Sequence, residues 1–138
     1  IAFLSMISLM VELTSCGAMK GLTVSLDSLN GEWTITELNG IAVVPAAGQE
    51  LPTLTFDTTT GSVSGNAGCN RVTGSFDTTA KKGTIDLSKM AATRMMCQDM
   101  TMEQNVLKAI AQVKGYRKAG EGMALTNGRR PVLVLTRK

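Results

Sequence analysis

Residues 61–76 read Gly-Ser-Val-Ser-Gly-Asn-Ala-Gly-Cys-Asn-Arg-Val-Thr-Gly-Ser-Phe. From Val72 onward, apolar or small residues alternate with polar ones, which is typical of a half-buried β-strand. Val63 lies in a shorter strand, and Gly65 and Gly68 after it indicate a bulge or a close approach of two backbones. The stretch therefore predicts two short strands and not a helix.

The same alternation appears on both sides of this stretch. Further strands are predicted at 31–40, 54–57, 85–87, 116–119, 123–127 and 131–136. The last of these contains Val-Leu-Val-Leu at 132–135, which is apolar on both faces. Both faces of that strand must therefore be covered by other parts of the chain.

One segment has the periodicity of a helix. Thr101 with Gln104 predicts a capping box at its start, Asp99 adds negative charge there, and Gly115 is expected to end it. Its apolar residues fall at spacings of four, four and three: Met102, Val106, Ile110 and Val113. We therefore expect an α+β fold, a small, strongly curved, mostly antiparallel sheet or partly open β-barrel of about seven or eight strands, with one α-helix packed on it.

The composition of the chain excludes several classes of function. The chain has 138 residues, enough for one domain, and a net charge of +3 with no histidine. Without histidine, Ser-His-Asp and Cys-His catalytic groups and histidine-ligated zinc sites are excluded. The candidate acids Asp57, Asp77 and Asp86 fall on the solvent faces of the predicted strands. We therefore expect no catalytic residues, no metal and no cofactor, and the scattered basic residues argue against nucleic-acid binding.

The N-terminal residues are typical of an export signal. Residues 1–14 form an apolar run shorter than the roughly 20 residues of a membrane-spanning helix. Leu-Thr-Ser-Cys at 13–16 then resembles a bacterial lipobox, in which the thiol of Cys16 receives a lipid. We expect a signal peptide at 1–15, a lipidated tether at 16–27 and the domain at 28–138. The alternative is an apolar N-terminal helix or strand with a buried free cysteine.

Gly17 after the modified cysteine implies sorting to the outer membrane, and no acidic run marks the chain for the cell surface. We therefore expect a lipoprotein of the bacterial cell envelope that faces the periplasm, held at the membrane by Cys16. Once Cys16 is lipidated, Cys69 and Cys97 remain as an even pair in an oxidising compartment. A disulfide between them is the favoured interpretation, and two separate buried thiols are the alternative.

Two motifs in order carry a resemblance to a family. Residues 61–76, and residues 90–100 followed by Glu-Gln at 103–104, resemble the signature of the META domain, the HslJ-like family. The likeness extends over about Leu26 to Arg137. It implies a curved sheet with one helix in a bacterial envelope protein, associated with tolerance of heat, antibiotics or other envelope stress, and without an established catalytic activity. The motif positions are Gly65, Gly68, Cys69, Asn70, Arg71, Gly74, Thr93, Arg94, Met95, Cys97 and Asp99.

Most of these positions are interpreted as structural. The glycines suit close packing, Asn70 can bond the backbone of a turn, and Arg94 can pair with Asp99 or cap backbone carbonyls. The alternative is a binding site formed by Asn70, Arg71 and Arg94 beside the disulfide.

The favoured function is a non-enzymatic envelope lipoprotein that binds a partner and supports stress tolerance. One alternative is a periplasmic inhibitor of a cell-wall lytic enzyme such as lysozyme, with Arg94 or Lys89 on a protruding loop. Another is a lipid carrier with an adaptable apolar cavity lined by methionine. The expected partners are the membrane, through Cys16, and an envelope protein or a small apolar ligand, with the chain itself a monomer.

Overall fold

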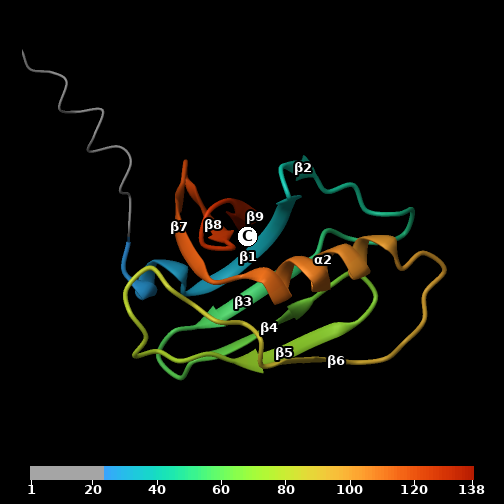
Figure 1. Ribbon diagram of the computed structural model, residues 1–138. Helices are drawn as coiled ribbons and strands as arrows, with labels where there is room; N and C mark the ends of the chain where they lie inside the picture. The colour runs from blue at the N-terminus through green and yellow to red at the C-terminus, as the bar shows by residue number, and fades with distance from the viewer. Residues whose placement is uncertain (1–23) are drawn as a thin grey trace, which may run out of the picture.

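A computed structural model describes residues 24–138, which form one nine-stranded sheet and one α-helix (Figure 1). The strand order is β6-β5-β4-β3-β1-β9-β8-β7, with β2 paired to β1, and every pairing is antiparallel. The helices are a short 3-10 helix, η1 (Leu26–Leu29), and α2 (Thr101–Gln112). The strands are β1 (Gly31–Leu38), β2 (Ile41–Ala42), β3 (Thr53–Asp57), β4 (Ser62–Asn66), β5 (Arg71–Ser75), β6 (Met90–Ala92), β7 (Gly115–Ala119), β8 (Gly122–Thr126) and β9 (Pro131–Arg137).

The predicted curved antiparallel sheet with one packed helix is confirmed, but the sheet is not a closed barrel because β6 and β7 do not pair. A strap, residues 83–89, crosses the gap between the two edges. At one end Tyr116 N–H donates to Gly83 O (3.0 Å) and Ile85 N–H donates to Lys114 O (3.1 Å). At the other end the strap runs directly into β6, and Ser75 N–H donates to Lys89 O (3.3 Å) as a continuation of the β5–β6 pairing. The strap therefore links the two edges through the chain itself on one side and through two hydrogen bonds on the other.

The core lies between the curved sheet and α2. The predicted apolar stripe of the helix is confirmed, since Met102, Val106, Ile110 and Val113 all belong to the buried cluster. From the sheet the cluster takes inward-facing side chains of most strands: Trp33, Ile35, Leu54, Phe56, Val63, Val72, Tyr116, Met123, Leu125, Leu133 and Leu135. Burial of each large apolar side chain stabilises the fold by about 2 kcal/mol. The sheet curls around the helix because this arrangement removes the apolar faces of both from water.

One predicted strand is wrong, and two short strands were missed. The strand expected at 85–87 is part of the strap, where only Thr84 forms a bridge, to Gly115. Its alternation is nevertheless real, because Ile85 and Leu87 are buried and the residue between them is exposed. The short strands β2 and β6 were not predicted, because neither has enough residues to show an alternation.

The ends of α2 also differ from the expectation. No capping box forms. Instead the carboxylate of Asp99 accepts a hydrogen bond from Thr101 N–H (2.9 Å), and Met100 occupies the N-cap position without a side-chain bond. At the other end Val113 is the C-cap, and Gly115 is already the first residue of β7. The Asp99 carboxylate thus accepts a hydrogen bond from a free N–H group of the first helical turn, which is also the function of a capping box.

The strand registers define two opposite ends of the molecule. At one end Gly31, Phe56, Val63 and Gly74 are neighbours across four strands, and the described chain starts there with η1. At the other end, the residues that are neighbours across the same four strands are Thr34, Thr53, Asn66 and Arg71. The loops of both sequence motifs lie at this end. We call the first the N-terminal end and the second the motif end (Figure 1).

Candidate functional site

The loop between β4 and β5, residues 67–70, lies against the first turn of α2. Gly68 has φ +133°, and an added Cβ there would lie 3.0 Å from Met102 Cε and 3.5 Å from Glu103 Cβ. Only glycine combines this backbone conformation with so close an approach. At Gly65 and Gly74 a Cβ would collide with the carbonyl oxygens of neighbouring strands. The close packing expected at the motif glycines is therefore present.

A buried carboxylate joins this loop to the helix. Glu103 is only 4% exposed, and its Oε1 accepts hydrogen bonds from Cys69 N–H (2.8 Å) and Asn70 N–H (2.6 Å). Its Oε2 accepts a third from the side-chain amide of Asn70 (2.6 Å). Burial raises the pKa of Glu103, but these three donors outweigh it and hold the pKa below its ordinary value. The carboxylate is therefore ionised at neutral pH and serves as an acceptor.

Asn70 connects the same carboxylate to the β6–α2 loop, residues 93–100. Its side-chain oxygen accepts from Met95 N–H (2.6 Å) and from the Thr93 hydroxyl (2.8 Å). Its amide donates to Met95 O (3.0 Å) as well as to Glu103. All four hydrogen-bonding positions of the amide are used, and the residue is 3% exposed. Asn70 thus bonds backbone, as expected, but the backbone of a loop 25 residues away and not that of its own turn.

The predicted disulfide is present. Cys69 and Cys97 are bonded, with Cα atoms 6.0 Å apart and a sequence separation of 28. Arg71 and Thr93 add a pair of bonds beside it, since Arg71 N–H donates to the Thr93 hydroxyl (3.1 Å) and Thr93 N–H donates to Arg71 O (3.0 Å). The β6–α2 loop is therefore tied to the β4–β5 loop on both sides of Met95.

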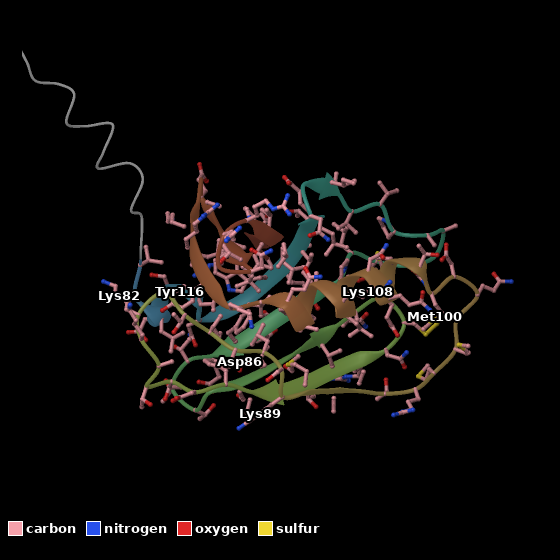
Figure 2. The ribbon with its side chains drawn as sticks, viewed as in Figure 1. Lys82, Asp86, Lys89, Met100, Lys108 and Tyr116 are labelled. Carbon is pink, nitrogen blue, oxygen red and sulfur yellow. A yellow bond between two sulfur atoms is a disulfide. The ribbon has the colours of Figure 1, made fainter. Side chains whose placement is uncertain are left out.

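The side chains that this scaffold displays include apolar, basic, polar and acidic ones, since Gln98 and Asp99 of the same loop are exposed as well. Met95 and Met96 are 62% and 86% exposed, and Arg71 and Arg94 are also exposed. Neither expected contact of the Arg94 guanidinium, with Asp99 or with a backbone carbonyl, is formed within residues 24–138. The Asp99 carboxylate accepts from Thr101 N–H. Of the three residues proposed for binding, Asn70 is buried inside the scaffold and the two arginines lie at its surface. In Figure 2 Met100 marks this end of the molecule and Lys82 the other.

Glu103 is the residue whose role the sequence did not reveal, although a signal was available. It falls in the same helical stripe as Val106, Ile110 and Val113, at spacings of three and four. An acidic residue on the buried face of a helix must find hydrogen-bond donors there. The motif turn, with its free N–H groups, was the place to look for them.

The three candidate acids are surface residues. Asp57, Asp77 and Asp86 are all exposed, as their strand positions predicted. Hydrogen bonds from Thr79 lower the pKa of Asp77, and hydrogen bonds from Ser88 lower that of Asp86. A general acid at neutral pH needs a raised pKa, so these shifts run the opposite way.

Residues 24–138 hold neither a candidate metal cluster nor a membrane-spanning helix. No group of three or more acidic or cysteine side chains there is arranged to hold a metal ion. No helix in that part of the chain is long and apolar enough to cross a bilayer.

The described fold is similar to the folds of proteins with solved structures. No curated protein matches the chain. Among solved structures, a protein from Burkholderia xenovorans determined by NMR is similar, with TM-score 0.57 and 25% identity over 80% of this chain and 83% of that one. A second NMR structure, with TM-score 0.59, 18% identity and coverage of 80% and 91%, shows likeness of fold alone. The META domain family model matches residues 24–138, which include both motifs and the whole described fold. The chain therefore belongs to the META domain family.

Proposed function

We propose that this chain is a non-enzymatic, lipid-anchored envelope protein that binds a partner protein through its motif end and thereby supports tolerance of envelope stress. The observation that carries the proposal is the contrast between a buried, fully bonded scaffold and the side chains it holds outward. Asn70 fixes the backbone of Met95 from both sides, while Met95 and Met96 remain 62% and 86% exposed. Large apolar side chains held in water on a rigid loop favour binding, because little further order is lost on association.

The charge around the two methionines supports a particular kind of partner. Arg71 and Arg94 are both exposed on the segments that the Thr93 bonds hold together. Two arginines against one exposed carboxylate, Asp99, leave these segments with a net positive charge. An apolar centre with a mainly basic rim complements a surface with apolar pockets and acidic edges. The partner we propose is therefore an acidic envelope protein and not a nucleic acid.

The position of the first described residues agrees with this arrangement. The described chain starts at the N-terminal end, and the motifs lie at the opposite end of the same strands. Cys16 and the other residues of the proposed signal peptide and lipobox lie outside the described residues. If a lipid on Cys16 holds the N-terminal end at the outer membrane, the motif end points away from the membrane into the periplasm, where a partner can reach it.

The binding proposal can be tested by site-specific photocrosslinking in living cells. A photoreactive residue at Met96 should give a discrete protein adduct, whereas the same residue at Lys82 should not. Lys82 is the control, since it is exposed but lies at the opposite end of the molecule (Figure 2). Arg94→Ala should reduce the adduct while changing the free energy of unfolding by no more than about 0.5 kcal/mol. Equal adducts from both positions, or none from Met96, would contradict the proposal.

The anchor is tested separately. Cys16→Ala should abolish labelling of the chain by a radioactive or clickable fatty acid and leave it unprocessed or released from the membrane fraction. Normal labelling of this variant would show that the anchor lies elsewhere.

Exposed Arg94 also favours a second candidate, inhibition of a cell-wall lytic enzyme. A basic side chain on an exposed loop complements the two catalytic carboxylates of such an enzyme, and Arg94 is exposed on the β6–α2 loop. Adding the purified protein to lysozymes should then slow cell lysis, and Arg94→Ala should restore it. Unchanged lysis would eliminate this candidate and leave the first one standing.

A further inference from the structure

The side chains that two-electron oxidants attack are distributed very unevenly in this protein. The chain has no histidine, and its one tryptophan and one tyrosine, Trp33 and Tyr116, are 2% and 4% exposed. Cys69 and Cys97 are joined in the disulfide, so neither has a thiol. Among the described residues, this leaves the thioether sulfurs of methionine as the readily oxidised groups.

The described methionines differ widely in their exposure. Met102 and Met123 are 9% and 2% exposed and belong to the core, whereas Met95 and Met96 are mostly exposed. Met90 and Met100 are intermediate, and the Met100 sulfur accepts a long contact from Cys97 N–H (3.5 Å). Met6, Met10 and Met19 lie outside the described residues. An oxidant that reaches the domain therefore meets Met95 and Met96 first.

We propose that Met95 and Met96 are a site of reversible oxidation, at which a two-electron oxidant such as hypochlorous acid converts each thioether to a sulfoxide. In each step an S=O bond forms, the sulfur gives two electrons to chlorine, and chloride and a proton are released. Sulfoxides of methionine are returned to thioethers by dedicated reductases, so the change can be undone.

The scaffold explains why this oxidation would not unfold the protein. Met95 is held through its backbone N–H and C=O, both bonded to Asn70, and not through its side chain. Oxidation therefore changes the displayed surface from apolar to polar while the loop stays in place. If the motif end binds a partner as proposed above, oxidation would release that partner; this consequence rests on the proposed function, but the modification site does not.

The modification is tested on the full chain with graded hypochlorous acid and peptide mass spectrometry. Fragment spectra that locate each added oxygen should show Met95 and Met96 gaining one oxygen each at least about tenfold faster than Met102 and Met123, following their exposure. Equal rates for the exposed and buried pairs, or faster reaction of the buried pair, would overturn the proposal. The thermal unfolding midpoint of the oxidised protein should remain within a few degrees of the untreated one, and loss of the folded state would overturn it as well.

The change of surface has its own measurement. Oxidised wild type should elute earlier than untreated protein from a hydrophobic-interaction column, and the double variant Met95→Leu/Met96→Leu should show no such shift after the same treatment. A similar shift in the variant would place the reaction at other residues and refute the assignment. If oxidation is selective but photocrosslinking at Met96 finds no partner, the proposed binding fails while the modification site stands.

Discussion

Glu103 is the residue on which the motif end depends most directly. Its carboxylate brings a negative charge onto the buried face of α2, which would destabilise the fold if it had no donors. Three donors from Cys69 and Asn70 satisfy it and in doing so fix the β4–β5 loop to the helix. One acidic side chain thus connects the first sequence motif to the second.

Replacing Glu103 by glutamine should destabilise the protein by about 2–3 kcal/mol, because hydrogen bonds to a charged acceptor are lost and the new amide faces the amide of Asn70. The free energy of unfolding in urea measures the effect. Glu121→Gln, an exposed residue in the β7–β8 turn, is the matched control and should change it by no more than about 0.5 kcal/mol. Equal effects of the two substitutions would contradict the proposed role of Glu103.

The lowered pKa of Glu103 predicts a dependence on pH. In the unfolded chain this group titrates near its ordinary pKa of 4.5, and in the folded protein it titrates at lower pH. Its contribution is therefore complete above that value and is lost as the pH falls through the folded pKa. The difference in unfolding free energy between wild type and Glu103→Gln should be constant near neutral pH and shrink below about pH 4.5.

The comparison with the variant isolates Glu103 from other acids. Hydrogen bonds also lower the pKa of Asp77, Asp86 and Asp99, but these groups are present in both proteins and cancel in the difference. A difference that grew toward acid pH would show that the carboxylate is not the stabilising form.

Among the elements, the β6–α2 loop shows how little of a segment's conformation comes from its own residues. Its backbone is held by Asn70 and Thr93 at one point and by the disulfide at another. The strap is a second case. It has the alternation of a strand, but it pairs only through one bridge, between Thr84 and Gly115, because no complete partner strand runs beside it. Both segments take their conformation from neighbours that are distant in the sequence.

Removing the disulfide with Cys69→Ser/Cys97→Ser should destabilise the protein by about 3.5 kcal/mol, from the chain entropy of a loop closed over 28 positions. The fold should persist, because the bonds of Asn70 and Glu103 do not involve sulfur. Urea unfolding gives the loss, and reduction of the wild type should reproduce it. A variant as stable as the oxidised wild type would show that the bond does not constrain the unfolded chain.

For the whole molecule, the unpaired edges β6 and β7 make the strap important to closure. Ile85 and Leu87 are 3% and 1% exposed and carry this segment into the core. The curved sheet therefore depends on side-chain packing at the one place where its hydrogen-bond ladder is interrupted.

Ile85→Ala should destabilise the protein by about 3 kcal/mol through loss of buried volume. Hydrogen exchange of the Tyr116 N–H, which donates to Gly83 O, should accelerate more than that of central-strand amides. Ile41→Ala is the control, since the same side chain is 72% exposed at β2, and should be nearly neutral. Similar effects at the two positions would mean that the strap does not close the sheet.

The local patterns of the chain predicted the class of fold, the helix with its apolar stripe and most strands. The cysteine pair was predicted from the number of cysteines. Alternation and helical periodicity arise from backbone geometry and the burial of apolar side chains, so they can be read from neighbouring residues. The contact between Glu103 and Asn70, the strap and the outward display of Met95 and Met96 could not be read in this way. They depend on which distant donors, edges and loops the folded chain brings together, and no local pattern encodes those distances.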